Sequence, residues 1–127
     1  MKPGKTGLQR LIDATSYSFK GIKACWRNEA AFRQEVLLVA VLLPLSFGVA
    51  ATVEQWLLLV LPLLLLLIVE LLNSAVENIV DRIGHERNEL SGRAKDMGSA
   101  AVLFCLTMAG LSWVAIGWKN FAPWQGG

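Results

Sequence analysis

Three long apolar stretches dominate the chain and limit what it can fold into. They cover residues 36–51, 56–69 and 97–118, and the second continues in diluted form to residue 80. Each approaches the roughly 20 residues that a helix needs to cross about 30 Å of hydrocarbon. Because 54% of the 127 residues are hydrophobic, the composition is also typical of a membrane protein. We therefore predict an all-α membrane protein with three transmembrane helices.

The segment before the first apolar stretch predicts a helix of a different kind. Apolar residues between Leu8 and Trp26 recur at spacings of three and four, which places them along one narrow stripe. Arg10, Lys20 and Lys23 fall on other faces, as in a helix that lies in the membrane interface with basic side chains toward anionic headgroups. A helix packed on the bundle is the alternative. The predicted elements, all within one domain of residues 1–127, are a surface helix over 6–27 and transmembrane helices over about 30–50, 54–83 and 91–119.

The distribution of Lys and Arg predicts the orientation of the chain. Of these twelve residues, seven precede the first apolar stretch, four lie between the second and third, and one follows the third. By the positive-inside rule, the N-terminus and the 81–96 connection are cytoplasmic and the C-terminus is outside. Trp56 and Trp118 then fall at the outer interface, where tryptophan is enriched. The seven N-terminal cations are Lys2, Lys5, Arg10, Lys20, Lys23, Arg27 and Arg33.

Several residues receive structural rather than chemical interpretations. Cys25 and Cys105 lie far apart in the chain and are interpreted as small packing residues. His85 is interpreted as a solvated loop side chain. Gly84 is expected to end the second transmembrane helix and Ser91 to cap the start of the third. Three spans with short connections bury little surface of their own, so we expect an oligomer, and no nucleic-acid partner is expected.

A polar strip interrupts the cytoplasmic half of the second span. At 100° per residue, Glu70, Asn73, Glu77 and Asp81 fall within about 80° of one another, and Ser74 extends the strip. A carboxylate at the centre of a membrane helix costs roughly 2.5–3.5 kcal/mol, whereas the twelve Leu, Ile and Val residues of 57–69 contribute about 4–7 kcal/mol. The helix therefore inserts in spite of its acids, and acids kept at such a cost indicate a functional site.

Other polar residues are expected at the same depth. Glu29 begins the first span, and Lys95 and Asp96 begin the third. Carboxylates from two helices suit Mg²⁺, which takes one or two acids together with phosphate oxygens and water. A lysine in the first turns of a helix suits a phosphate. Glu70 lies deeper, where partial desolvation favours a general base for a hydroxyl presented from the lipid.

These residues indicate phosphoryl transfer from a nucleotide to a lipid alcohol, but two other interpretations remain open. An acid-lined oligomer could conduct ions or protons, and the strip could be a structural seam between helices. Conduction is disfavoured because residues 57–69 carry no polar side chain, so the strip does not continue across the membrane. The chain has neither a G-x-x-x-x-G-K-[ST] loop nor the Gly-rich loop of protein kinases.

Three segments together carry a recognisable pattern: NEAAFRQE (28–35), VELLNSAVENIVDRIG (69–84) and ELSGRAKDMGSAAV (89–102). They closely resemble the small integral-membrane diacylglycerol kinases of Gram-negative bacteria. The resemblance covers nearly the whole chain and is carried by N-E, then E-x-x-N-x-x-x-E, then A-K-D. It implies a homotrimer in the bacterial inner membrane that uses MgATP to convert diacylglycerol to phosphatidic acid, in an active site shared between subunits.

The resemblance also implies roles for individual residues. Glu70 matches the catalytic base of the family, and Glu29 and Glu77 match the acids that coordinate the metal ion. Further matches are Asn73, Lys95 and Asp96 around the phosphates; Arg10, Tyr17 and Glu86 near the nucleotide; and Glu35, Ser99 and Trp113, with Arg10 and Glu70, on the lipid substrate. Variation is expected at Arg87 and Asn88.

A related branch of the family, the undecaprenol kinases, shares the acidic face and the A-K-D element. Here the segments GRAKDMGSAAV and RLIDATSYSFKGIKACW are more similar to the diacylglycerol branch. The expected activity is therefore diacylglycerol kinase, with undecaprenol kinase as the alternative.

Overall fold

The computed structural model describes residues 6–123, and this part of the chain folds into four α-helices without strands. They are α1 (Gly7–Asn28), α2 (Ala30–Val49), α3 (Val53–Ile83) and α4 (Glu89–Phe121). The last three are long and apolar enough to cross a membrane. The predicted all-α fold, with an N-terminal helix and three potential spans, is confirmed. Lys2 and Lys5, which contribute to the orientation prediction, lie outside the described residues.

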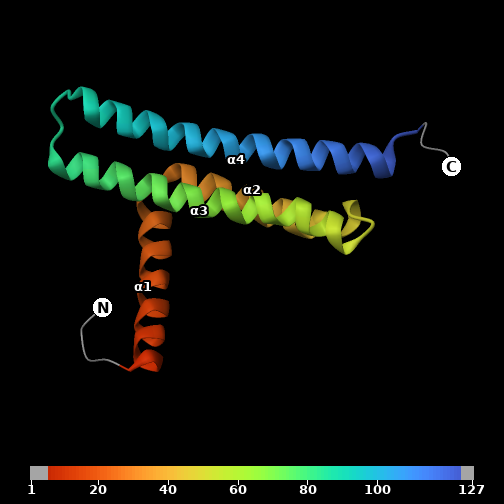
Figure 1. Cartoon of the computed structure of the whole chain (residues 1–127), viewed down its shortest axis with the longest axis horizontal. Coiled ribbons are helices and arrows are strands. Elements are labelled where there is room, and N and C mark those ends of the chain that lie inside the picture. Colours follow the sequence, from red (N-terminus) through yellow and green to blue (C-terminus); the bar gives the residue numbers. More distant parts are fainter. Residues whose placement is uncertain (1–5, 124–127) are drawn as a thin grey trace.

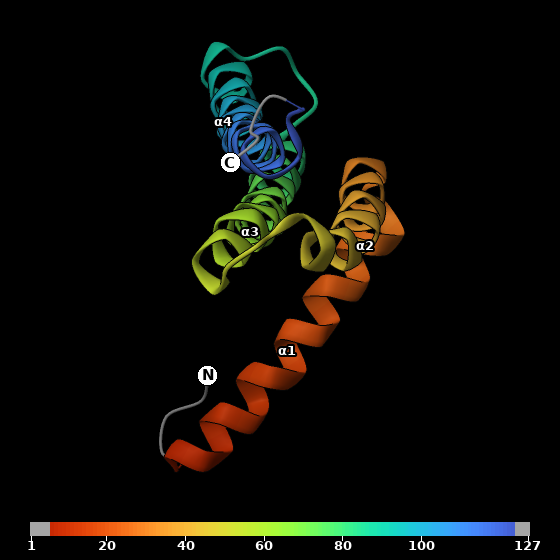
Figure 2. The same ribbon diagram turned by 90° about the vertical axis from the view of Figure 1, so that its right-hand side faces the viewer.

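Helices α2, α3 and α4 run alongside one another, with α3 between the other two (Figures 1 and 2). The α3–α4 connection and the start of α2 lie toward one end of this bundle, and the end of α4 lies at the other (Figure 1). We call these the inner and the outer end. Helix α1 meets the bundle near the inner end and extends away across the direction of the other helices (Figure 1).

Helix α1 begins at a capped residue and contacts the bundle mainly through its last turns. The Thr6 hydroxyl accepts a hydrogen bond from the backbone N–H of Gln9 at 3.2 Å, which caps the helix. Cys25 is its only buried residue, whereas Leu11 and Phe19 of the apolar stripe are 65% and 69% exposed. A transverse helix with an exposed apolar stripe has the form of a helix that lies in a membrane interface.

The α2–α3–α4 bundle packs around a small apolar core. Val39, Leu63 and Ala109 meet there, one from each helix, and Trp113 packs against them. The Trp113 indole N–H donates to the carbonyl oxygen of Leu59 at 3.1 Å, so the polar atom of this large side chain is satisfied inside the bundle. This core lies in the outer part of the bundle, separate from the polar strip on α3.

The predicted N-cap of the last helix is wrong. Helix α4 begins at Glu89, and Asn88 is its N-cap, because the Asn88 carboxamide oxygen accepts from the backbone N–H groups of Leu90 and Ser91 at 2.9 and 3.2 Å. Asparagine is among the strongest N-cap residues, and its position places Ser91 inside the first turn. Gly84 is the C-cap of α3, as expected.

Hydrogen bonds join the three helices at the outer end. The Asn120 amide of α4 donates to the carbonyl oxygen of Val49 at 2.7 Å and to Gln55 Oε1 at 2.9 Å. Gln55 Oε1 also accepts from the backbone N–H of Ala51 at 2.8 Å. We refer to Asn120, Gln55, Val49 and Ala51 as the outer clasp, since it ties the end of α4 to the α2–α3 connection.

Candidate active site

The polar strip of α3 is largely buried in the protein. Glu70, Ser74 and Asn73 are 3%, 4% and 9% exposed. The Asn73 side-chain amide donates to Glu77 Oε1 at 3.2 Å, and Asn73 also interacts with the carboxyl group of Glu70. Residues three and four apart on a helix lie on one face, so the helical period brings the side chains of Glu70, Asn73 and Glu77 together.

Glu29 joins the strip from the junction of α1 and α2. It is the single residue between the two helices, and its extended backbone (φ −121°, ψ 109°) turns the chain from α1 into α2. Burial, followed by the nearby carboxylates of Glu77 and Asp81, raises the pKa of Glu29 above its ordinary value. Acids from two elements therefore gather at one place, as the sequence predicts.

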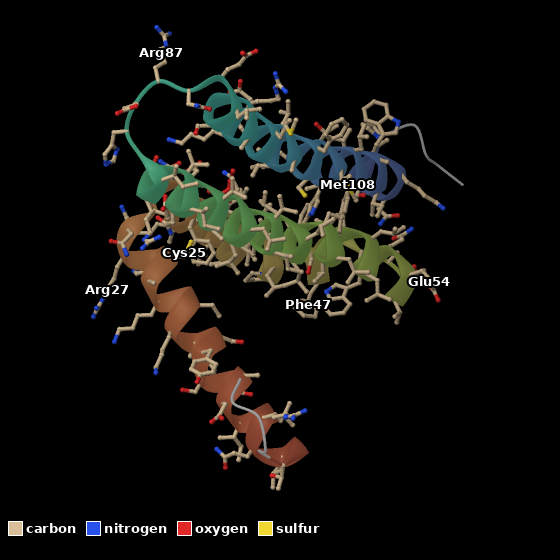
Figure 3. All side chains as sticks on the ribbon, turned by 60° about the vertical axis from the view of Figure 1, so that its left-hand side comes forward. Cys25, Arg27, Phe47, Glu54, Arg87 and Met108 are labelled. Atoms are coloured by element: carbon tan, nitrogen blue, oxygen red, sulfur yellow. The ribbon has the colours of Figure 1, made fainter. Side chains whose placement is uncertain are left out.

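Cys25 fixes the end of α1 against α3. Its thiol donates a hydrogen bond to the Ser74 hydroxyl, with the two heavy atoms 3.5 Å apart, and Figure 3 shows Cys25 at the junction of the two helices. Burial raises the pKa of the Cys25 thiol, which disfavours the reactive thiolate and agrees with a packing role. A cavity of about 330 Å³ opens beside this contact, and its lining includes Glu29 and Asn78.

Helix α4 contributes Lys95 to the other side of the strip. Its ammonium nitrogen lies 2.7 Å from Asp81 Oδ1, and both side chains are partly exposed. A cavity of about 210 Å³ lies beside this ion pair, under the α3–α4 connection, and Glu86 and His85 contribute to its lining. Figure 3 shows Arg87 on the same connection, directed away from the bundle.

The gathered oxygen atoms suit a divalent cation. Within residues 6–123, His, Cys, Asp and Glu side chains form no group of three placed to hold a metal ion by themselves. Glu29 and Glu77 nevertheless lie close enough for their charges to interact, so two carboxyl groups from different elements can contribute oxygen ligands. Mg²⁺ prefers such oxygen ligands and takes its remaining ligands from phosphate and water. The residues therefore fit the magnesium ion that the sequence predicts.

Glu35 lies on the deeper side of the strip. One of its carboxylate oxygens is buried without a hydrogen-bond partner, and its charge interacts with that of Glu70. Two carboxyl groups, one from α2 and one from α3, thus face the same buried region.

Other predicted residues do not join this cluster within one copy of the chain. Tyr17 is 55% exposed and stacks under the Lys20 ammonium, which lies 5.6 Å from the ring centre. Arg10 is nineteen residues before Glu29, which is roughly 28 Å along a helix. Trp113 lies in the apolar core of the bundle. Ser99 and Asp96 are exposed on α4, close in sequence to Lys95.

Sequence reasoning did not identify Gly98 as part of this site. A Cβ atom at Gly98 would overlap the Asn73 carboxamide oxygen. A glycine inside a helix is unfavourable by propensity, and this was the available signal, but the partner across the helix pair could not be read from α4 alone.

Comparisons with known proteins place the chain in one family. Residues 16–117 match the family model described as prokaryotic diacylglycerol kinase. The chain is 50% identical over 123 residues to a diacylglycerol kinase of Escherichia coli strain K12, covering 95% of this chain and 99% of that protein. Diacylglycerol kinases of Haemophilus influenzae and Pseudomonas aeruginosa are each 50% identical, over 87% and 89% of this chain and 94% and 92% of their own lengths.

Proposed function

The chain belongs to the prokaryotic diacylglycerol kinase family, and from this premise we propose that it transfers the γ-phosphate of ATP to diacylglycerol and forms phosphatidic acid. The observation that carries the proposal is the meeting of Glu29, Glu70, Asn73 and Glu77 at the inner end of a membrane bundle. A soluble nucleotide and a membrane lipid can both reach such a site.

Glu70 is the proposed general base. It accepts the proton of the lipid hydroxyl while the hydroxyl oxygen attacks the γ-phosphorus, and the bond from that phosphorus to the bridging oxygen of ADP breaks. The products are the phosphorylated lipid and ADP. The location of Glu70 deeper than Glu77 supports this role, because the reacting hydroxyl arrives from the lipid side. Glu35, whose charge interacts with that of Glu70, lies where it can contact the lipid headgroup.

Lys95, Asp96 and Asn73 are proposed to bind the phosphates. The Lys95 ammonium is held by Asp81 beside the acids of α3, where it can neutralise phosphate oxygens. Glu29 and Glu77 would hold Mg²⁺, which lowers the charge repulsion between the triphosphate and the carboxylates when it is bound. Most of the catalysis would therefore come from positioning and electrostatic stabilisation.

The nucleotide and lipid contacts at longer range are proposed from the family resemblance. Arg10, Tyr17 and Glu86 would lie near the nucleotide. Because Arg10 lies nineteen residues before Glu29 on α1, we infer that another subunit of a homotrimer supplies it. Ser99 and Trp113 would face the lipid substrate. An apolar cavity of about 770 Å³ between α1 and the α2–α3 pair reaches Leu71, the neighbour of Glu70, and can accept an acyl chain. The inner end would face the cytoplasm and the C-terminus the periplasm, in the bacterial inner membrane.

The test uses the purified chain in mixed micelles with labelled ATP and Mg²⁺. Diacylglycerol and undecaprenol are offered separately at equal mole fraction, and the labelled lipid is identified. The expected product is phosphatidic acid, with little label on undecaprenol. Turnover on undecaprenol alone would move the chain to the other branch of the family. Ion flux in proteoliposomes, without phosphorylation of either lipid, would favour the conducting oligomer instead.

A further inference from the structure

Gly98 packs directly against one side chain of the neighbouring helix α3, that of Asn73. A Cβ atom built on Gly98 would meet three Asn73 atoms: it would overlap the carboxamide oxygen and lie 3.0 Å from Cγ and 3.7 Å from Cβ. The other glycines of α4 differ, since Gly92, Gly110 and Gly117 have nothing within 4 Å of such an atom. The absence of a side chain at Gly98 therefore leaves the space that Asn73 occupies.

This contact fixes the direction of the Asn73 carboxamide. Its N–H₂ group donates to Glu77 Oε1 at 3.2 Å, and its buried oxygen lacks a hydrogen-bond partner. The hydrogen that replaces a side chain on the Gly98 Cα atom points at this oxygen, and a C–H group is only a weak donor. The amide is thus held between Gly98 on α4 and the acids of its own helix.

Gly98 also affects the distance between Lys95 on α4 and Asn73 on α3. It lies three residues after Lys95 on α4, and the Lys95 ammonium reaches across to Asp81 on α3. A larger residue at position 98 would either rotate Asn73 away from Glu77 or push α4 from α3. Both changes move the lysine, the amide or the carboxylates relative to one another.

We propose that Gly98 is a positioning residue for phosphate transfer, which it serves by fixing the Asn73 carboxamide and the approach of α4 to α3. This inference rests on the proposed function, because it assumes that Asn73 and Lys95 act on the phosphates. Gly98 itself touches no reacting atom; its effect passes through Asn73.

The experiment is a double-mutant cycle between positions 98 and 73, with Gly110→Ala as the matched control on the same helix. For each variant, kcat, the KM for ATP, the oligomeric state and the thermal unfolding midpoint are measured. We expect Gly98→Ala to lower kcat by about 10- to 100-fold, as a displacement of about 1 Å can do, with KM changed less than about threefold. Alanine is the better helix former, so Gly110→Ala should keep wild-type activity and stability.

The decisive comparison is made in the Asn73→Ala background. There the clashing carboxamide is absent, so adding Gly98→Ala should change neither the residual kcat nor the unfolding midpoint appreciably. An equal loss in both backgrounds would overturn the inference, as would a Gly98→Ala protein with wild-type kcat. If Gly98→Ala alone does not fold, recovery of folding in the double variant supports the contact, and failure of both overturns it.

The outcome also separates this inference from the proposed function. A wild-type protein that phosphorylates no lipid overturns both. An active wild type with an equally active Gly98→Ala variant overturns only the role of Gly98.

Discussion

Glu70 is a buried acid in a helix that is otherwise suited to lipid. Only 3% of its surface is exposed, and a charged group in this environment is costly. Asn73 and Glu77, one and two turns further along α3, provide polar contacts on its inner side. A buried carboxyl group with polar partners on one side and apolar residues on the other has the surroundings that a general base for a lipid hydroxyl requires.

The proposed role of Glu70 as general base predicts that Glu70→Gln loses activity but keeps its structure. The amide keeps the shape of the side chain but cannot accept the proton, so kcat should fall by about 10²- to 10⁴-fold. The KM for ATP and the thermal unfolding midpoint should stay near wild type, because burying the neutral glutamine amide costs no more than burying the glutamate carboxyl group. Glu54→Gln is the control, since Glu54 is exposed at the outer end of α3 (Figure 3). A fully active Glu70→Gln protein would remove Glu70 from the mechanism.

If Glu29 holds Mg²⁺ as proposed, its raised pKa predicts how Mg²⁺ binding depends on pH. The cation binds the ionised carboxylate, so protons compete with it, and binding should weaken as pH falls through the raised pKa, above the ordinary value of about 4.3. In the metal-free protein the pH dependence of folding stability has the opposite sign. The folded state holds this proton more tightly than the unfolded chain, so stability falls as pH rises through the same range.

The measurement is the rise in the thermal unfolding midpoint on adding Mg²⁺, from about pH 5 to pH 8. The rise should grow with pH in the wild type and stay small and nearly constant in Glu29→Gln. The same pH dependence in both proteins would show that Glu29 does not bind the cation.

The residues that sequence could predict differ from those that it could not. Glu70, Asn73 and Glu77 share one helix, so the period of 3.6 residues per turn is enough to place them on one face. The contact between Gly98 and Asn73 needs the register of α4 against α3, which no local pattern determines. The choice of Asn88 over Ser91 as N-cap depends on a backbone conformation that both residues favour.

At the scale of elements, the outer clasp connects α4 to the α2–α3 connection far from the polar strip. Asn120 donates both of its amide hydrogens there, one to a backbone carbonyl of α2 and one to Gln55. The Val49 carbonyl is at the end of α2, where helix carbonyls lack intrahelical partners. We therefore expect the outer clasp to contribute to the stability of the fold and not to catalysis.

Asn120→Ala should destabilise the protein by about 1 kcal/mol, because it removes two part-buried hydrogen bonds and leaves the Val49 carbonyl oxygen without this donor, while Gln55 Oε1 keeps the Ala51 N–H. The kcat at a temperature below unfolding should remain within about twofold of wild type, since the clasp lies at the other end of the bundle. Thr107→Ala is the control, because the exposed Thr107 hydroxyl bonds only to Leu103 of its own helix. An unchanged unfolding midpoint in Asn120→Ala would contradict the stabilising role.

The four helices were more predictable than their contacts. The second span is predicted over 54–83, and the helix in the structure, Val53–Ile83, starts one residue earlier and ends at the same residue. Its ends could be placed because the capping residues Thr52 and Gly84 flank an apolar run. The last helix extends beyond the predicted 91–119 at both ends, to Glu89–Phe121. That α3 lies between α2 and α4 could not be read from spans of such similar composition.

At the scale of the whole molecule, one copy of the chain does not complete the predicted site. Helix α1 extends away from the bundle (Figure 1), and Arg10 is roughly 28 Å along it from Glu29. If Arg10 contacts the nucleotide, it must do so in the site of a neighbouring subunit. A symmetric oligomer provides such a neighbour.

Subunit mixing tests this arrangement. Arg10→Ala and Glu70→Gln are each expected to be impaired alone, but mixed oligomers should recover about a quarter of wild-type activity, the share of random neighbours that combine an intact Glu70 with an intact Arg10. A mixture of Glu70→Gln with Asn73→Ala is the control and should recover none, because both residues lie on α3 of one subunit. Equal results from the two mixtures would place Arg10 in its own subunit's site.

The single residue between α1 and α2 has a mechanical consequence. Since Asn28 ends one helix and Ala30 begins the next, Glu29 is the whole connection between α1 and the first potential span. If α1 lies on the bilayer surface, as its exposed apolar stripe predicts, any change in the angle between the two helices must move the Glu29 backbone. We therefore expect the position of this carboxylate to depend on the thickness and curvature of the surrounding lipid.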